Sequence, residues 1–374
     1  MPTSPLAWPT PTSLSLFPWL ASVDRALRVA DAATDTGHAA VGQTPKRVVW
    51  TRNQVRLVRY DARTPSQQPV PLLLVHSLVS RPYILDLIPG NSFVEYLLDQ
   101  GFDVYLTDWG VPTAADTGLQ LKDYVLDYLP AMVDAVLREA EATELSMLGY
   151  CMGGLLTLLY AATHPDGPVR NLLTLATPVD FDQLGLQGIW ARAMDADRLV
   201  DHYGNVPAAL IQRSFQLLKP ASEVSPVRLL GLWQHVEDER YVAQYRAFDR
   251  WSNDHIDFPG EAFRQTLREL VQGNKLVRGG MELDGIPIDL STIRQPFLAI
   301  AAEADHIVPL AAARPQMELV GSADTTFLPL PGGHVGLAAG RKAKASLWPR
   351  VAAWLTARAG DATAPVEDED RIAA

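Results

Sequence analysis

Short, uninterrupted apolar runs recur along most of the chain, separated by longer stretches that carry apolar residues at helical spacing. Six such runs predict strands, at 71–76, 103–109, 144–149, 171–177, 296–303 and 325–330. Runs without polar alternation are typical of parallel strands whose two faces are both covered by helices. The stretches between and after them predict helices, including 121–142, 153–163 and 347–359.

The chain before these runs follows two other patterns. From Ser22, apolar residues at helical spacing, with a serine cap at the start and Gly37 at the end, predict an amphipathic helix. The stretch "RVVWTRNQVRLVRYDA" then alternates around Arg52 and Asn53, which predicts an antiparallel hairpin. The predicted fold class is therefore α/β, a mostly parallel sheet flanked by helices with an antiparallel start.

The alternation of strand and helix is interrupted once. Residues 181–289 give no strong strand signal but contain several aromatic-rich helical stretches, and we interpret them as a helical cap or lid. The core is then expected at 45–180 and 290–359, after an N-terminal segment, 1–44, that carries the amphipathic helix. The acidic tail 360–374 is poor in large apolar residues, which predicts disorder.

Composition narrows the class of protein. The 374 residues are 48% hydrophobic and 20% charged, as in an ordinary globular protein, and the net charge of −11 argues against nucleic-acid binding. The single cysteine cannot form an internal disulfide, which fits a reducing compartment. No run of eighteen apolar residues and no basic leader occur, so we expect a cytoplasmic protein without a transmembrane segment.

That single cysteine stands in "LGYCMGGLL", directly after one predicted strand and before a predicted helix. A lone cysteine is more often a buried apolar residue than a reactive one. Here glycines at 149, 153 and 154 surround Cys151 as in the nucleophile elbow of the α/β-hydrolase fold, with cysteine in the usual place of serine. The backbone N–H of Met152 would stabilise an oxyanion, and the helix N-terminus favours a thiolate.

An elbow of this kind requires an acid and then a histidine after later strands. Asp305 follows the strand predicted at 296–303, and His334 follows the last predicted strand between glycines. Two alternatives stay open for the acid: Asp305 as a helix N-cap, and Glu303 as the competing carboxylate. His306 is a weaker candidate for the base.

The residues "VHSLVS" follow the first predicted parallel strand, where hydrolases build the second half of the oxyanion hole. The backbone N–H of Val79, or of its neighbour Leu78, is the expected donor. His76 is expected to brace this loop rather than to react. The other histidines share no spacing typical of metal ligands, so no metal site is expected.

Together these residues resemble the polyhydroxyalkanoate synthases, and among them the short class III catalytic subunits. The resemblance extends from about Thr44 to about Trp354. It rests on "LVSRPYILDL", "GFDVYLTDWGVP", "LGYCMGG", "LATPVDF", "FDRWSNDHIDFPGEAFRQ", "NKLVRGG", "EADHIVP" and "GGHVG", in this order.

The resemblance implies an acyltransferase with a Cys-His-Asp triad that takes (R)-3-hydroxyacyl groups from coenzyme A thioesters. Cys151 would hold the growing polyester as a thioester and His334 would deprotonate it. Asp305 would orient His334 or help to activate the incoming 3-hydroxyl. No cofactor is implied, because coenzyme A is part of the substrate.

The resemblance also implies partners: a second, non-catalytic synthase subunit, self-association, and the polymer granule in the cytoplasm. Two positions depart from the class III pattern. Met152 stands where that class usually has glutamine, and His76 where it more often has tyrosine. Neither departure removes a reacting group.

Two other functions remain open. One is a cysteine-dependent hydrolase, thioesterase or intracellular depolymerase on the same fold, and the other is a catalytically silent scaffold that binds granules or a partner. The aromatic residues of the predicted cap allow two interpretations as well: they line a channel that excludes water, or they form the cap's own small core. These residues are Trp190, Trp233, Tyr241, Tyr245 and Trp251.

Overall fold

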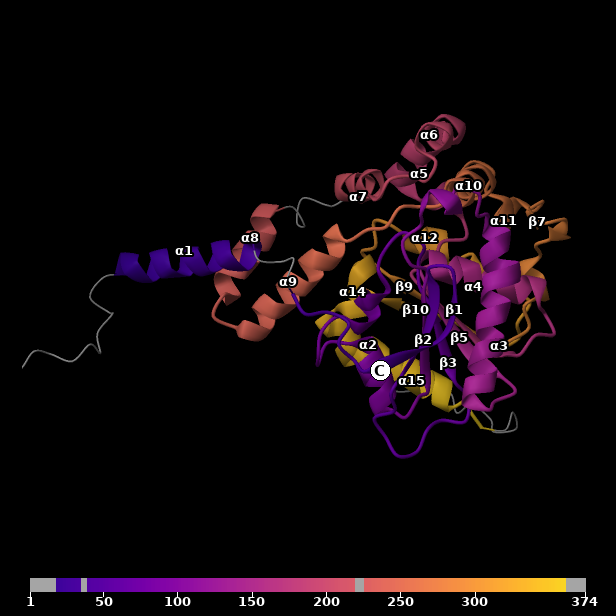
Figure 1. Cartoon of the computed structure of the whole chain (residues 1–374), viewed down its shortest axis with the longest axis horizontal. Coiled ribbons are helices and arrows are strands. Elements are labelled where there is room, and N and C mark those ends of the chain that lie inside the picture. The colour runs from indigo at the N-terminus through magenta and orange to yellow at the C-terminus, as the bar shows by residue number, and fades with distance from the viewer. Residues whose placement is uncertain (1–17, 35–38, 219–224, 361–374) are drawn as a thin grey trace, which may run out of the picture. The chain divides into compact units, whose positions relative to one another are not determined.

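The computed structural model describes residues 18–34, 39–218 and 225–360. The chain forms two compact units: a larger one of residues 40–219 and 251 onward, and a smaller one of residues up to 39 and 220–250. Figure 1 follows their helices and strands along the chain. No helix within the described ranges is long and apolar enough to cross a membrane.

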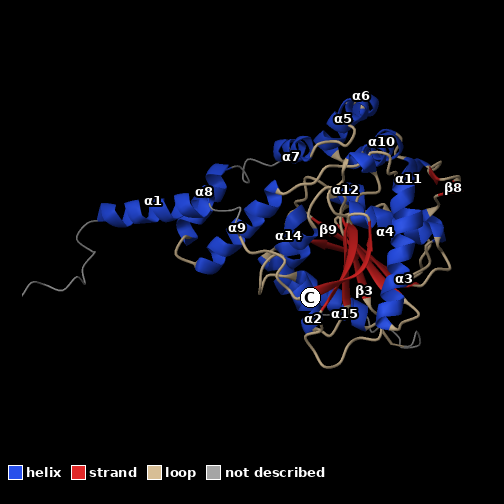
Figure 2. Ribbon diagram, in the orientation of Figure 1, coloured by secondary structure: helices blue, strands red, loops and turns tan. Residues whose placement is uncertain are grey.

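An eight-stranded sheet forms the centre of the larger unit (Figure 2). Its order is β1-β2-β4-β3-β5-β6-β9-β10. The strands are β1 (Lys46–Arg52), β2 (Val55–Tyr60), β3 (Leu72–Val75), β4 (Val104–Asp108), β5 (Leu145–Tyr150), β6 (Val169–Leu175), β9 (Phe297–Ala302) and β10 (Thr325–Leu330). The six apolar runs correspond to β3, β4, β5, β6, β9 and β10, so their prediction as strands is confirmed.

The sheet begins antiparallel, as the alternating pattern predicts. Strands β1 and β2 form a hairpin whose turn places Asn53 at φ 53°, in the left-handed region that asparagine tolerates better than most residues. Strand β2 then pairs antiparallel with β4, and every pair from β4 to β10 is parallel. The predicted hairpin and the α/β fold class are both confirmed.

Helices cover both faces of this sheet, which is why its central strands contain almost no polar residues. Every residue of β3, β5 and β9 is buried. Helices α3 (Leu129–Ala140) and α4 (Met152–Thr163) lie on one face (Figure 1). Helices α2 (Phe93–Asp99), α14 (His334–Ala339) and α15 (Trp348–Thr356) lie on the other.

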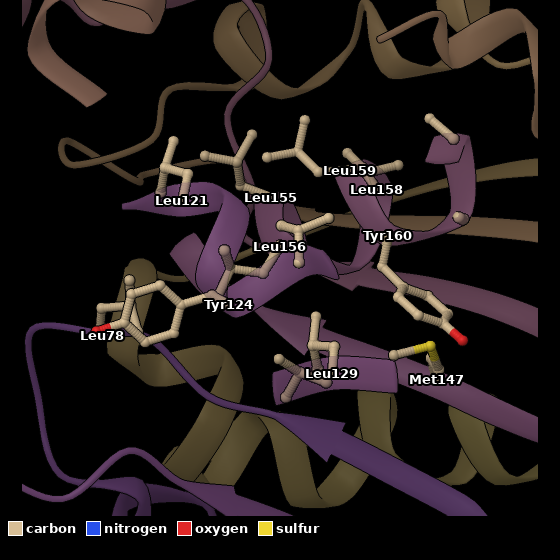
Figure 3. Close-up of a cluster of buried hydrophobic side chains, with 14 of the residues drawn as sticks. Leu78, Leu121, Tyr124, Leu129, Met147, Leu155, Leu156, Leu158, Leu159 and Tyr160 are labelled. Carbon is tan, nitrogen blue, oxygen red and sulfur yellow. The ribbon is translucent and has the colours of Figure 1, made fainter. Parts of the chain in front are cut away.

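Helix α4 is buried on nearly all sides. Its leucines, among them Leu155 and Leu159, belong to a cluster with Met147 of β5 and with Tyr124 and Leu129 from the preceding helical segment (Figure 3). A helix that is apolar all round is typical of a protein interior. Because α4 begins at the residue after Cys151, this packing anchors the elbow from behind.

Two π-helical turns that the apolar spacing did not indicate occur in or next to predicted helices. The stretch 121–142 forms a π-helical turn at Asp123–Tyr128 followed by α3. The stretch 347–359 forms α15, which follows a second π-helical turn at Ala343–Leu347. A π-helical turn is short and lies beside regular α-helix, so the helical spacing of the whole stretch did not reveal it.

Residues 181–289 are mainly helical, as predicted, and contribute to both units. Their helices are α5 (Gly185–Ala193), α6 (Ala196–Tyr203), α7 (Ala208–Leu217), α8 (Ser225–His235), α9 (Glu239–Asn253), α10 (Gly260–Gln265) and α11 (Lys275–Arg278). The pattern gave no signal for the two-residue strands β7 (Glu282–Leu283) and β8 (Ile286–Pro287), which pair antiparallel. Helices α12 (Leu310–Ala313) and α13 (Gln316–Leu319) follow β9. The role of 181–289 as a cap stays a prediction.

The smaller unit contains α1 (Pro18–Thr34), α8 and most of α9. Two ion pairs, each at 2.7 Å, connect α1 to the rest of this unit: Arg25 to Glu237, between α8 and α9, and Asp31 to Arg246 of α9. The predicted start of α1 at Ser22 is wrong: the helix begins at Pro18, because proline fixes a helical φ and lacks the N–H that a first helical residue leaves unused. Gly37 and the tail 361–374 lie outside the described residues.

Candidate active site

The residues expected to form the active site follow the carboxyl ends of parallel strands, and these ends meet at one edge of the sheet. Cys151 follows β5, Asp305 follows β9 and His334 follows β10. The loop that begins at His76 follows β3, the immediate neighbour of β5. The topology therefore brings four segments that are distant in sequence to the same edge.

Cys151 occupies a tight turn between β5 and α4. Its backbone adopts φ 55° and ψ −119°, a conformation that costs a non-glycine residue on the order of 1–3 kcal/mol. The hydrogen bond from its N–H to Leu175 O, at 2.8 Å, holds the turn against β6. The side chain is partly exposed. This is the geometry of a nucleophile elbow, which projects its side chain from the edge of the sheet.

Close backbone contacts explain the three glycines of the elbow. A Cβ at Gly153 would lie 2.0 Å from Val75 O, and one at Gly154 would lie 1.9 Å from Thr177 Oγ1. A Cβ at Gly149 would lie 2.3 Å from the Cα of Gly154. Any side chain at these positions forces the strand, the turn or the helix apart. The spacing of the glycines is thus a packing requirement of the elbow.

A hydrogen-bond chain supports the elbow from β6 and α13. Thr177 donates its hydroxyl to Cys151 O at 3.1 Å, and Gln316 donates its amide to Thr177 O at 2.8 Å. Thr174 in turn donates to Gln316 Oε1 at 2.7 Å. Sequence reasoning missed this support. Thr177 lies in the quoted "LATPVDF", but nothing in the sequence pattern marks Gln316 as its partner.

His334 and Asp305 are in direct contact. The Nδ1 of His334 lies 2.7 Å from Asp305 Oδ2, and both residues are buried, each with 6% of its surface exposed. The other carboxylate oxygen of Asp305 accepts the backbone N–H groups of Ile307 and Val308, each at 2.8 Å. Three hydrogen bonds therefore fix the position of the Asp305 carboxylate beside the imidazole.

Asp305 combines the two roles that its sequence position suggested, a turn cap and a partner of the histidine, and uses a different carboxylate oxygen for each. One oxygen binds a local turn, as the capping interpretation expects, although α12 begins only at Leu310, and the other contacts His334. Glu303, the competing acid, is exposed. The carboxylate that the structure brings to His334 is thus that of Asp305.

Electrostatics favour a protonated His334. Burial alone disfavours the imidazolium, but the charges of Asp305 and Cys151, and hydrogen bonds to both, outweigh it and raise the pKa of His334 to about 10. Cys151 is therefore close enough to interact with the imidazole. Asp305 and Cys151 together thus favour the protonated form of the His334 imidazole.

The buried ring of Tyr150 lies next to His334, and the buried ring of His76 lies next to Tyr150. The ring of Tyr150 lies between those of His76 and His334, with centroid distances of 5.8 and 5.4 Å. Burial lowers the pKa of His76 to about 3, so its imidazole is neutral, and its Nε2 lies 3.1 Å from Ser80 Oγ. His76 thus braces its own loop, as the sequence suggested. Sequence reasoning missed Tyr150 as a neighbour of His334.

The two expected oxyanion donors lie on adjacent segments. Met152 is the first residue of α4, so its N–H has no acceptor within the helix. Val79 belongs to the loop after β3, and a Cβ at Gly153 would lie 2.8 Å from the carbonyl carbon of His76. The start of that loop therefore passes directly over the start of α4. The roles of Met152 and Val79 stay predictions.

The aromatic residues of the predicted cap differ in their surroundings. Trp251 is 7% exposed and Trp190 is 36% exposed. Trp233 and Tyr241 make ring contacts inside the smaller unit.

The described ranges contain no group of three or more His, Cys, Asp or Glu side chains suited to a metal ion.

Known proteins resemble the chain in sequence over most of its length. Residues 70–338 match the family model of the alpha/beta hydrolase fold, and residues 23–97 match that of the poly-beta-hydroxybutyrate polymerase (PhaC) N-terminus. The solved alpha/beta hydrolase fold protein from Nakamurella multipartita superimposes with a TM-score of 0.51 at 18% identity, over 84% of this chain and 100% of that one. This likeness supports the predicted fold.

Curated relatives are more similar. The poly(3-hydroxyalkanoate) polymerase subunit PhaC of Allochromatium vinosum is 40% identical over 85% of this chain and 90% of its own length. The subunits of the same name from Haloferax mediterranei and Synechocystis sp. are 38% and 36% identical, over 93% and 85% of this chain and 71% and 86% of their own lengths. The chain thus belongs to the poly(3-hydroxyalkanoate) polymerase (PhaC) family, within the alpha/beta hydrolase fold.

Proposed function

We propose that the protein is a poly(3-hydroxyalkanoate) polymerase, which transfers (R)-3-hydroxyacyl groups from coenzyme A thioesters to a growing polyester and releases coenzyme A. The observation that carries the proposal is Cys151 at a nucleophile elbow, beside a buried His334 that contacts Asp305 at 2.7 Å. Family membership supports the choice of acyl transfer to a polyester among the reactions this geometry allows.

In this mechanism the thiolate of Cys151 attacks the thioester carbonyl of the substrate. A new thioester forms at Cys151, the bond to the coenzyme A sulfur breaks, and the proton on His334 passes to the leaving thiolate. The exchange of one thioester for another costs little free energy. Serine would form an oxyester instead, a poorer acyl donor to the hydroxyl of the next monomer.

Chain extension then requires a hydroxyl group as the nucleophile. His334, now neutral and oriented by Asp305, takes the proton of the 3-hydroxyl, directly or with the help of Asp305, as that oxygen attacks the acyl thioester at Cys151. An ester C–O bond forms, the C–S bond to Cys151 breaks, and the released thiolate of Cys151 pairs with the imidazolium of His334. The lengthened chain, now a coenzyme A thioester, returns to Cys151 by the same thioester exchange as in the first step. The backbone N–H groups of Met152 and Val79 stabilise the oxyanion in both steps. Loss of one such donor typically costs on the order of 3 kcal/mol of activation free energy.

The wider assignments follow from the same proposal. Residues 181–289 act as a cap that excludes water, so that a hydroxyl and not water attacks the acyl group. No cofactor is needed, because coenzyme A arrives and leaves as part of the substrate. The protein works on polymer granules in the cytoplasm, self-associates and pairs with a second, non-catalytic subunit, as class III enzymes do.

The test is incubation of the purified protein with (R)-3-hydroxybutyryl-CoA, alone and with a candidate second subunit. The proposal predicts free coenzyme A together with insoluble polymer, and loss of both in Cys151→Ala. Free coenzyme A with only monomeric acid would indicate a thioesterase instead. Unchanged in-cell polymer yield and unchanged activity in Cys151→Ala would indicate a silent scaffold.

A further inference from the structure

The loop that carries Val79 is held on one side by the body of the sheet. The side chain of His76 contacts Ser80 Oγ at 3.1 Å, which ties the start of the loop to its end. The indole of Trp109 donates to His76 O at 2.8 Å, and Thr107 Oγ1 accepts the His76 N–H at 2.9 Å. These contacts fix the first residue of the loop but leave the residues beyond Ser80 to other partners.

The other side of the loop pairs with the residues that follow α9. The N–H of Ile256 donates to Val79 O at 3.3 Å, and Ser80 forms an isolated antiparallel bridge with His255. The carbonyl of Val79, the proposed oxyanion donor, is therefore bound by a segment distant in sequence. Both segments belong to the larger unit.

Side chains extend this pairing into a clasp, which we define as Trp251 and Asp254 with their partners Arg81 and Tyr83. Trp251 donates its indole N–H to Arg81 O at 2.8 Å. The carboxylate of Asp254 accepts from Arg81 Nε on one oxygen and from the Tyr83 hydroxyl on the other, each at 3.0 Å. One carboxylate thus ties together two side chains that follow the loop.

None of these four side chains belongs to the proposed triad or supplies an oxyanion donor. Asp254 and Arg81 are each about one-third exposed, so the ion pair is partly screened by water and adds little to global stability. The carboxylate of Asp254 matters more for the position of the loop, because it binds Arg81 and Tyr83, two and four residues after Val79.

We propose that Asp254 is a positioning residue for the oxyanion hole: by holding Arg81 and Tyr83 it keeps the Val79 N–H aimed at the oxyanion. The inference rests on the proposed function, since it takes Val79 as an oxyanion donor. An oxyanion donor acts only when it lies within hydrogen-bond distance of the developing charge. A displacement of about 1 Å costs on the order of 100-fold in rate.

The first test measures the loop itself and does not depend on turnover. Hydrogen exchange of the backbone amides in the peptide 77–83 is compared between the wild type, Asp254→Ala and Asp254→Glu. We expect faster exchange in Asp254→Ala and partial restoration in Asp254→Glu, which keeps a carboxylate. Equal exchange in all three proteins would overturn the clasp.

The second test measures the acylation of Cys151 as the single-turnover release of coenzyme A. Asp254→Ala is expected to slow this step by about 10- to 100-fold and to change the KM for substrate by less than about twofold. Tyr83→Phe removes one of the two hydrogen bonds to Asp254, so its acylation rate is expected to lie between those of Asp254→Ala and the wild type. An acylation rate equal to that of the wild type, or a loss confined to KM, would overturn the inference.

Asp324→Ala is the matched control. Like Asp254, Asp324 accepts one side-chain hydrogen bond on each carboxylate oxygen, but both come from Arg358, at 2.9 and 3.0 Å. Asp324 directly precedes β10 and so lies at the amino end of that strand, away from the carboxyl ends that carry Cys151, Asp305 and His334. We expect this variant to lose similar thermal stability and to keep the wild-type acylation rate. If the wild type itself releases no coenzyme A, the proposed function fails, whereas the exchange measurement still decides the clasp.

Discussion

Asp305 makes several hydrogen bonds at this site, and its two carboxylate oxygens have different partners. Asp305 binds two backbone N–H groups with one oxygen and His334 with the other, so the backbone turn fixes the carboxylate that contacts the imidazole. Sequence order predicted the residue types and their succession along the chain. It could not show which oxygen serves which partner, because that depends on the turn after β9.

The charge state of His334 depends on this contact. Asp305→Asn removes the negative charge that stabilises the imidazolium, whereas the burial that destabilises it remains. The pKa of His334 should therefore fall clearly below about 10. NMR titration of 15N-labelled histidine, with His334→Gln to assign the signal, measures it. An unchanged pKa in Asp305→Asn would mean that Asp305 does not control the proton.

His76 gives a second pH-dependent effect of opposite sign. Its pKa falls from 6.5 to about 3 on folding, so below pH 6.5 the unfolded chain binds a proton that the folded chain does not. Stability is full above pH 6.5 and is lost as the pH falls toward 3, by roughly 1.4 kcal/mol per pH unit.

Urea unfolding at pH 7.5 and pH 5 tests this effect. The wild type should lose about 2 kcal/mol more between these two values than His76→Gln, which keeps a polar group but cannot titrate. Equal losses in the two proteins would show that His76 is not neutral in the folded state.

At the scale of elements, the strand–elbow–helix unit depends on close approach of backbones. The sequence predicted this unit well, because buried strands and glycine spacing leave local signals. It did not reveal the support from Thr177, which follows β6, and from Gln316 of α13, because these two residues meet only in the folded protein. The start of α1 was predicted four residues too late, because Ser22 is a good capping residue and the helix begins before it, at Pro18.

A methyl group at Gly153 should break the unit. Gly153→Ala places Cβ 2.0 Å from Val75 O, a backbone atom of a central strand that cannot move aside. We expect a loss on the order of 3 kcal/mol in the free energy of unfolding, measured by denaturant titration. Gly118→Ala is the control, because nothing lies within 4 Å of its added Cβ. Similar stability of the two variants would contradict the close packing of the elbow.

At the scale of the whole molecule, the two units differ in how much apolar surface they bury. The described buried apolar residues of the smaller unit are Ala32, Leu232, Val236 and Ala247, whereas the larger unit holds a sheet covered on both faces. Periodicity predicted the helices of both units. It did not predict this division, because residues 220–250 join α1 across nearly 200 residues of sequence.

This difference predicts unequal local stability. Native-state hydrogen exchange should be faster in α1 and α8 than in β5 and β6, since few buried contacts oppose local opening in the smaller unit. Mass spectrometry of exchanged peptides measures it directly. Equal protection of the two units would mean that they unfold as one cooperative body.

The central claim is that Cys151 carries the growing polyester, and analysis of the covalent intermediate tests it most directly. The protein is mixed briefly with (R)-3-hydroxybutyryl-CoA and quenched in acid, and the peptide that contains Cys151 is examined by mass spectrometry. We predict a ladder of adducts on Cys151 spaced by single 3-hydroxybutyryl units, and none in Cys151→Ala. Polymer formation with unmodified Cys151, or at the wild-type rate in Cys151→Ala, would contradict the account.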